Sequence, residues 1–477
     1  MEVAAVIPKT SGLSNNEITE LLYKIDPNNS DVEIENDDNE ADIRAPEPNE
    51  LLDDLREDED NDVPEGEITP ITPGQAGSSR DPSQRWRHKN EFPVLPEMDQ
   101  TCSTGLSAGS SEIPEVKTPF SYFERYLKDD FFEDMAEFSN RKYVLLKGRS
   151  LNTNGPEIRK YWGASIAAAL VGFPKIRMCW DRRTRFPLIA DNISRDRFYT
   201  LRNSLKIVDD NAVSDLKKED RFWKVRPMLA RVRNACLENP RPKEISIDEQ
   251  MIPFHGQVRM KQFVRGKPQP VGLKNFVMTT TSGLPLDFLM YEGKGKEIVS
   301  GKAPLPEKLD VGGRVVLKLC DSLPAGSSIF IDRYFTSVPV LETLLSHRNI
   351  FCTGTIMSNR IPRSVELKRD NEMKREGRGC HDQVVRLDDK MSIVKWYDNR
   401  PIYLGSTICG VSPIEECRRW SKKDSAYIQV PRPYIVKMYN TNMGGVDLLD
   451  RILSKYAMRN RTKKWTVRVL HHFFILL

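Results

Sequence analysis

The chain has 477 residues, 39% of them hydrophobic, a length typical of a protein with two to four domains. It contains no apolar run as long as the roughly 18 residues of a membrane-spanning helix. Its N-terminus lacks a charged leader followed by an apolar block, so no secretory signal is expected. No two of the eight cysteines lie within three residues of each other. We therefore expect no zinc site and reduced, intracellular thiols.

Charge is distributed unevenly along the chain. Residues 1–70 contain 22 Asp and Glu against 4 Lys and Arg, whereas the remaining 407 residues contain 46 acids and 68 bases. An acidic tail joined to a basic body is typical of nucleic-acid-binding proteins. The alternative is a solvating tail on an ordinary surface.

The first 115 residues are predicted to be disordered. Their long acid-rich runs carry almost no aromatic residues and cannot bury enough apolar area to offset chain entropy. A short basic cluster, RWRHK at 85–89, interrupts this region. It is interpreted either as a nuclear-import or DNA-touching patch or as a plain linker.

Helical spacing of apolar residues begins near Pro119. It predicts one helix through Phe123, Tyr126 and Phe131, a second after Asn154-Gly155-Pro156, a third at 194–207 and a fourth at 220–237. Residues 116–240 are thus expected to form a basic helical domain.

From Ile245 the period changes to two, which indicates strands. A first strand reaches Asp248-Glu249, a hairpin covers 273–291, a helix follows Gly312-Gly313, and a short strand at 328–331 reaches Asp332. A further helix and a strand at 350–356 complete the order β-β-β-α-β-α-β. We therefore predict an α/β core with a mixed sheet.

Between these strands lies a ladder of cations. Arg259, Lys261, Arg265 and Lys267 share one parity with Phe263, while Val258, Met260 and Val264 share the other. This alternation predicts a half-buried strand with a basic outer face.

Residues 357–430 are polar and irregular, and are predicted to be a β-rich insertion. A loop at Asn440–Gly445 and a helix follow. This helix presents Asp447 and Asp450 on one face at i, i+3.

Three acids occupy informative positions: Asp248 and Asp332 at strand ends, and Asp447 in the first turn of a helix. Carboxylates gathered in this way suit Mg²⁺ or Mn²⁺ and metal-assisted phosphoryl transfer. Each acid also has a plain structural alternative. Asp248 would be a solvated strand end, Asp332 a surface ion pair with Arg333, and Asp447 a partner of the helix dipole.

Several ordered motifs resemble those of piggyBac-type transposases, over roughly residues 118–477. SIDEQ at 246–250, with KP at 267–268, Gly272 and Lys274, resembles the first catalytic motif; DRYFTS at 332–337 the second; and YN at 439–440 with MGGVD at 443–447 and Asp450 the third. RDRF at 195–198, KVRP at 224–227, TGT at 353–355, Trp396 with DN at 398–399, and RTKKW at 461–465 also agree.

This resemblance implies an RNase H-like catalytic core that binds metal through Asp248, Asp332 and Asp447, supported by Asp450. It further implies a nuclear, homodimeric enzyme without a membrane partner that cuts double-stranded transposon ends and joins them at TTAA. Glu249 is expected to be structural. The expected DNA contacts are Arg259, Lys261, Arg265, Lys267, Arg333, Arg461, Lys463, Lys464 and Trp465. Trp465 has a second interpretation, as a core anchor of the last helix.

Sequence patterns and the resemblance together give six segments: 1–115, a disordered acidic tail; 116–240, an all-α dimerisation and DNA-binding domain; 241–356, the first part of the core; 357–430, the insertion; 431–456, the last part of the core; and 457–477, the start of a second DNA-binding helical segment. The family's cysteine-rich, zinc-binding end is expected beyond this point and is absent from the sequence. The alternatives are a domesticated, catalytically inactive DNA-binding or chromatin-associated protein, and a fragment that does not fold stably.

Overall fold

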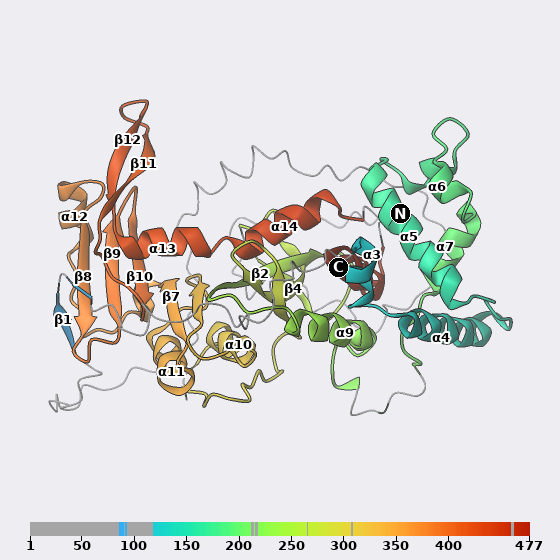
Figure 1. Ribbon diagram of the computed structural model, residues 1–477, viewed down its shortest axis with the longest axis horizontal. Coiled ribbons are helices and arrows are strands. Elements are labelled where there is room, and N and C mark those ends of the chain that lie inside the picture. The colour runs from blue at the N-terminus through green and yellow to red at the C-terminus, as the bar shows by residue number, and fades with distance from the viewer. Residues whose placement is uncertain are drawn as a thin grey trace, which may run out of the picture.

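The structure is a computed structural model, and it describes residues 85–89, 91–92, 118–210, 214, 218–264, 266–306, 309–458 and 462–477. A helical part, a mixed sheet with helices on both faces, and a projecting hairpin follow one another across the molecule (Figure 1). No helix in these residues is long and apolar enough to cross a membrane. The expected disorder of residues 1–84 and 93–115 lies outside the described residues.

The helical part contains α3 (Pro119–Glu124), α4 (Asp129–Lys147), α5 (Gly155–Val171), the 3-10 helix η5 (Ile176–Trp180), α6 (Pro187–Ala190), α7 (Arg195–Ser204) and α9 (Arg226–Leu237). The predicted first helix is two helices, because the chain turns between Arg125 and Lys128 before the acidic first turn of α4. Helix α5 begins as predicted, with the Asn154 side chain accepting from the Glu157 amide. The predicted fourth helix starts later, with Pro227 in its first turn.

Ten strands of the described residues form one mixed sheet, in the order β1-β8-β9-β10-β7-β6-β2-β4-β3, with β5 also on β4. Its bounds are β1 (Trp86–His88), β2 (Glu244–Pro253), β3 (Lys261–Phe263), β4 (Val271–Thr280), β5 (Pro285–Met290), β6 (Ser328–Ile331), β7 (Phe351–Thr355), β8 (His381–Arg386), β9 (Ser392–Tyr397) and β10 (Pro401–Ser406). Strands β2, β6 and β7 are mutually parallel, and the other pairs are antiparallel. The predicted alternation of strands and helices from β2 to β7 is confirmed, and β3 is a short part of the predicted basic ladder.

Helices cover both faces of the sheet. Helices α10 (Val311–Cys320) and α11 (Val338–Arg348) share a buried core with Ile245 and Ile247 of β2. On the opposite face, α14 (Gly445–Lys455) packs on β2 and β4 beside the helical part, into which α15 (Trp465–Leu476) inserts (Figure 1). The indole of Trp162 stacks on the Phe474 ring at 3.5 Å between centroids. Alternate residues of β2 therefore serve two different cores.

The insertion contributes strands, as its hairpin-like pieces predicted. Strands β8, β9 and β10 extend the main sheet beyond β7, and β11 (Glu415–Ser421) pairs with β12 (Ala426–Arg432) in a separate projecting hairpin. The remaining elements are η6 (Ser358–Arg360), α12 (Asp370–Glu376) and α13 (Tyr434–Asn442). Helix α13 continues to Asn442, so the predicted loop at 440–445 is limited to Met443-Gly444.

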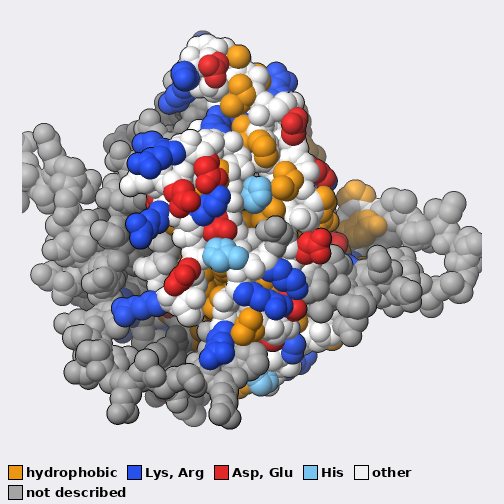
Figure 2. All heavy atoms as spheres, turned by 90° about the vertical axis from the view of Figure 1, so that its left-hand side faces the viewer, with side chains coloured by type: hydrophobic (Ala, Val, Ile, Leu, Met, Phe, Trp, Pro, Cys, Tyr) orange, Lys and Arg blue, Asp and Glu red, His pale blue; other side chains and the backbone are white. Residues whose placement is uncertain are grey.

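The prediction of disorder is wrong for the basic cluster at 85–89. Trp86–His88 forms β1, which pairs antiparallel with β8 at the edge of the sheet. Asp389 accepts from Arg87 at 2.8 Å and from Lys89 at 3.1 Å, and the His88 ring lies 3.3 Å from Asp382. Acidic and basic side chains intermingle on this face (Figure 2). The cluster is therefore an ion-paired edge strand and not an isolated basic patch.

Candidate active site

Asp248 and Asp332 directly follow paired residues of two neighbouring parallel strands. The register pairs Ile247 of β2 with Ile331, the last residue of β6; Asp248 is the next residue of β2, and Asp332 is the first residue after β6. The sequence predicted that Asp248 would end its strand, but β2 continues to Pro253. Asp248 does follow the last residue of β2 that pairs with β6, and this places the two acids at one end of the parallel pairing.

Helix α14 adds two more acids. Asp447 lies in its first turn and Asp450 one turn further, at the predicted i, i+3 spacing. A Cβ on Gly445 would collide with the Thr280 carbonyl oxygen and the Ser246 hydroxyl, so only glycine permits this close approach to β2 and β4. We call Asp248, Asp332, Asp447 and Asp450 the carboxylate cluster.

Burial and mutual repulsion raise the pKa of three members of the cluster, Asp248, Asp332 and Asp450. Burial, followed by the charge of Glu249, raises the pKa of Asp332 to about 6. Burial also raises the pKa of Asp450 to about 6, with a contribution from Asp447. The pKa of Asp248 is raised by burial, and Asp332 and Asp447 add to this shift. These carboxylates are therefore close enough to sense one another's charge.

One lysine faces the cluster. Lys267 lies in the turn between β3 and β4, and its Nζ donates to the Glu249 carbonyl oxygen at 3.4 Å. Burial alone would lower the pKa of Lys267, but the acids at 248, 249, 447 and 450 outweigh it, and the pKa is raised. The positive charge of this ammonium thus partly offsets the negative charge of several carboxylates.

Glu249 points to the opposite face of β2. Its carboxylate accepts from Lys274 Nζ at 2.6 Å, and the same ammonium lies over the Tyr334 ring at 4.8 Å. Glu249 thus has an ion-pair partner away from the cluster, and its structural role stays a prediction.

Sequence reasoning assigned no role to Tyr439, although the motif that contains it was noted. Burial raises the pKa of the Tyr439 phenol, and Asp332, Asp248 and Asp447 add to the shift. Its hydroxyl lies 3.4 Å from Thr355 Oγ1 on β7. Tyr439 therefore lies beside the carboxylate cluster. Its position on α13 alone did not reveal this placement.

The chemistry of these side chains fits a divalent cation. Carboxylate oxygens are the ligands preferred by Mg²⁺ and Mn²⁺. Burial, together with the charges of neighbouring acids, raises the pKa of Asp332 and Asp450 despite the nearby ammonium of Lys267. Within the described residues, no three His, Cys, Asp or Glu side chains are already gathered closely enough to hold an ion.

The basic ladder is not the single strand that the sequence predicted. Only Lys261–Phe263 is a strand, and the chain turns at Gly266, where φ is +85°. Lys261 is buried, and its ammonium donates to the Gly256 carbonyl at 3.0 Å, which corrects its expected exposure to DNA. Arg259 and Arg333 are exposed, whereas Arg265 lies outside the described residues.

The residues predicted to contact DNA at 461–465 also differ in their surroundings. Arg461 lies outside the described residues, and Lys463 is exposed. Lys464 Nζ donates to the Asn203 carbonyl of the helical part at 3.0 Å. Trp465 is buried, with its ring 5.8 Å from Phe222, so the structure supports the core-anchor interpretation over stacking on a base.

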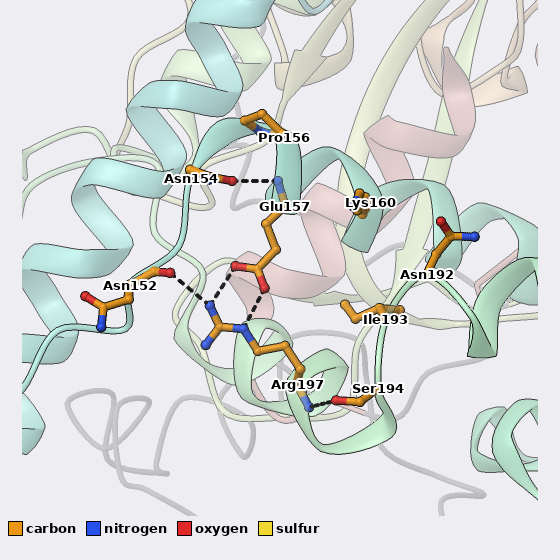
Figure 3. Close-up of a pocket in the computed structure, with 9 residues that line it drawn as sticks. All are labelled: Asn152, Asn154, Pro156, Glu157, Lys160, Asn192, Ile193, Ser194 and Arg197. Carbon is orange, nitrogen blue, oxygen red and sulfur yellow. Dashed lines mark hydrogen bonds and ion pairs between the residues drawn. The ribbon is translucent and has the colours of Figure 1, made fainter.

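A pocket of about 520 Å³ opens in the helical part, lined by residues of α5 and the start of α7 but by none of the cluster (Figure 3). Glu157 accepts two hydrogen bonds from Arg197, at 2.7 and 2.6 Å, and one from Thr153 at 2.7 Å. The RDRF motif therefore has a structural explanation: Arg197 holds Glu157, and Phe198 is fully buried.

Comparison with known proteins identifies the class. The family model described as Transposase IS4 matches residues 118–477, and the chain therefore belongs to that transposase family, in its piggyBac type. Human piggyBac transposable element-derived protein 3 is 32% identical over 358 residues, covering 73% of this chain and 58% of that protein. Human piggyBac transposable element-derived protein 2 is 30% identical over 372 residues, covering 75% and 60%. The chain thus spans about three-fifths of the length of these relatives.

A solved structure shares the fold. The cryo-EM structure of a piggyBac transposase synaptic complex with hairpin DNA superposes with a TM-score of 0.62 at 22% identity, covering 76% of this chain and 73% of that one. The large mixed sheet with flanking helices is therefore the fold of a piggyBac transposase.

Proposed function

We propose that this chain is a piggyBac-like cut-and-paste DNA transposase, or a domesticated derivative of one, with an RNase H-like catalytic core. The observation that carries the proposal is the position of Asp248 and Asp332 at matched places on parallel strands, under a helix that brings Asp447 and Asp450. Family membership supplies the reaction class, DNA strand cleavage and transfer, and TTAA is the proposed target.

Asp248, Asp332 and Asp447 would hold Mg²⁺ or Mn²⁺, with Asp450 in support. Bound divalent ions would lower the pKa of the attacking hydroxyl or water and stabilise the leaving oxygen of a phosphodiester. The chain's own residues prepare this chemistry. Helix α14 packs closely on β2 and β4 at Gly445, and this packing fixes its acids relative to β2. The ammonium of Lys267 reduces the repulsion among the acids when no cation is bound.

The proposed partners are double-stranded DNA and a second copy of the chain, in the nucleus. The exposed cations Arg259, Arg333 and Lys463 are available to contact phosphates. The DNA named in the related synaptic complex supports this partner. Arg265 and Arg461 remain candidates on sequence grounds.

One rival deserves a test, because the curated relatives are named as transposable element-derived proteins. In this alternative the fold binds DNA or chromatin without cutting it. The two proposals differ in a single measurable property, metal-dependent strand cleavage.

The experiment uses the purified full chain and a duplex DNA that carries the terminal inverted repeat of a cognate transposon. With Mg²⁺ or Mn²⁺ the wild type should nick the repeat end, and Asp332→Ala should bind the duplex without nicking it. Glu416→Gln is the control, since it removes an exposed acid of β11, in the hairpin that is separate from the main sheet. Binding without metal-dependent cleavage by the wild type would contradict the enzyme and favour the inactive derivative.

A further inference from the structure

Gln250 occupies an unusual position two residues after Asp248. Its side chain is 1% exposed and directly faces Asn275, which is fully buried, across the β2–β4 pairing. Gln250 Nε2 donates to Asp450 Oδ1 at 2.5 Å. Its Oε1 accepts from Asn275 Nδ2 at 3.2 Å and makes a hydrogen bond to His472 Nε2 at 2.8 Å. One amide thus joins β4, α14 and α15.

The chemistry of the partners fixes the direction of these bonds. A carboxylate only accepts, so the Gln250 nitrogen faces Asp450 and its oxygen faces the other two groups. His472 must then donate from Nε2. Burial, followed by the charge of Arg468, lowers the pKa of His472 to about 4, so the ring is neutral near pH 7 with its proton on the donating nitrogen. A flipped Gln250 amide would set its oxygen against the Asp450 carboxylate and lose that hydrogen bond.

We propose that Gln250 is a positioning residue that fixes the Asp450 carboxylate, and with it α14 and Asp447, against β2. Asn275 and His472 hold the Gln250 amide in turn. Because His472 belongs to α15, the packing of this last helix in the helical part influences the position of the Asp450 carboxylate through Gln250. The test has a structural arm and an activity arm. The activity arm rests on the proposed metal-dependent cleavage, whereas the structural arm is independent of it.

The structural arm measures backbone hydrogen exchange. Gln250→Leu and His472→Phe should accelerate exchange of the amides of 445–455, whereas His472→Gln, which keeps a donor, should retain most of the protection. Thr353→Val is the matched control, because it breaks a buried 2.7 Å hydrogen bond to Ser406 between β7 and β10. Wild-type exchange at 445–455 in Gln250→Leu would overturn the positioning role.

The activity arm measures how nicking depends on Mn²⁺. Gln250→Leu should raise the Mn²⁺ concentration for half-maximal nicking by roughly 10–100-fold, the usual effect of removing an outer-shell partner of a metal ligand. His472→Gln should rescue the loss caused by His472→Phe, and Thr353→Val should match wild type. An unchanged Mn²⁺ dependence in Gln250→Leu would also overturn the inference. A wild type that nicks at no Mn²⁺ concentration would overturn the proposed function instead, and the exchange arm would still decide the role of Gln250.

Discussion

Two groups of charged side chains in the described structure, the carboxylate cluster and the β1–β8 edge, have opposite electrostatic character. In the carboxylate cluster, burial and mutual repulsion raise the pKa of Asp332 and Asp450 to about 6. At the β1–β8 edge, hydrogen bonds from Arg87 and Lys89 lower the pKa of Asp389. The cluster is short of positive charge, and the edge has its charges paired.

This difference separates a candidate site from a structural contact better than the number of charges does. Crowded, partly buried like charges cost folding free energy, and such arrangements are concentrated at functional sites. Paired charges at an exposed edge fasten a strand and leave little charge for a ligand, in agreement with the mixed surface of that face (Figure 2). The comparison therefore predicts that replacing an acid by its neutral amide changes stability in opposite directions in the two regions.

The largest expected effect is that of Asp332→Asn. A folded-state pKa raised above the unfolded value means that ionisation opposes folding, so the cost appears as pH rises from about 4 to 6 and persists at pH 7. The isosteric amide should therefore raise the free energy of unfolding at pH 7 by roughly 1–3 kcal/mol and leave it unchanged near pH 3.5. Nicking should fall by more than the roughly 100-fold typical of outer-shell changes.

Thermal unfolding at both pH values, without metal, measures the first effect. Glu249→Gln is the control, and it should lose stability because it breaks the 2.6 Å ion pair with Lys274. If Asp332→Asn destabilised the metal-free chain at pH 7, the carboxylates would not be short of positive charge, and the comparison would fail.

The next effect concerns Lys267→Met. Loss of this ammonium leaves the carboxylates without their opposite charge, and we expect about 2–4 kcal/mol of destabilisation at pH 8. The loss should shrink at pH 5, because the acids with a pKa near 6 are then mostly protonated. Lys261→Met is the matched control: this lysine is also buried but donates to the Gly256 carbonyl. Burial lowers the pKa of Lys261, so removing its buried charge offsets part of the lost hydrogen bond. The small net change in stability should be equal at both pH values. Equal pH dependence for the two variants would contradict the prediction.

The sequence predicted those parts of the site that depend on local pattern. The strands before Asp248 and Asp332 and the i, i+3 acids of α14 follow from periodicity, and strand order then brings them together. The Gln250 amide network was not predictable, because it joins β2, β4, α14 and α15 through residues up to 222 positions apart. No local pattern encodes such a contact.

The errors have a common physical cause. Period two at 257–267 suggested one exposed basic strand, but Gly266 turns the chain, and Lys261 and Lys267 face inward. Composition suggested disorder around 85–89, yet β8 offers an unpaired edge and Asp389 offers charge, so the segment pairs. In both cases tertiary partners decided what the local pattern left open.

The smallest expected effect lies at that edge, for Asp389→Asn. A lowered folded-state pKa means that ionisation favours folding, so this contribution is present above the unfolded pKa and is lost as pH falls through the folded one. The pair is partly exposed, with side chains 45% and 35% accessible, and screening limits the loss to less than about 1 kcal/mol at pH 7. The loss should shrink near pH 3 and at about 1 M salt. Chemical denaturation of the full chain can resolve it against Glu416→Gln, which changes an exposed acid of β11. If Asp389→Asn instead raised the stability, ionisation of Asp389 would oppose folding as it does in the carboxylate cluster, and the contrast between the two regions would fail.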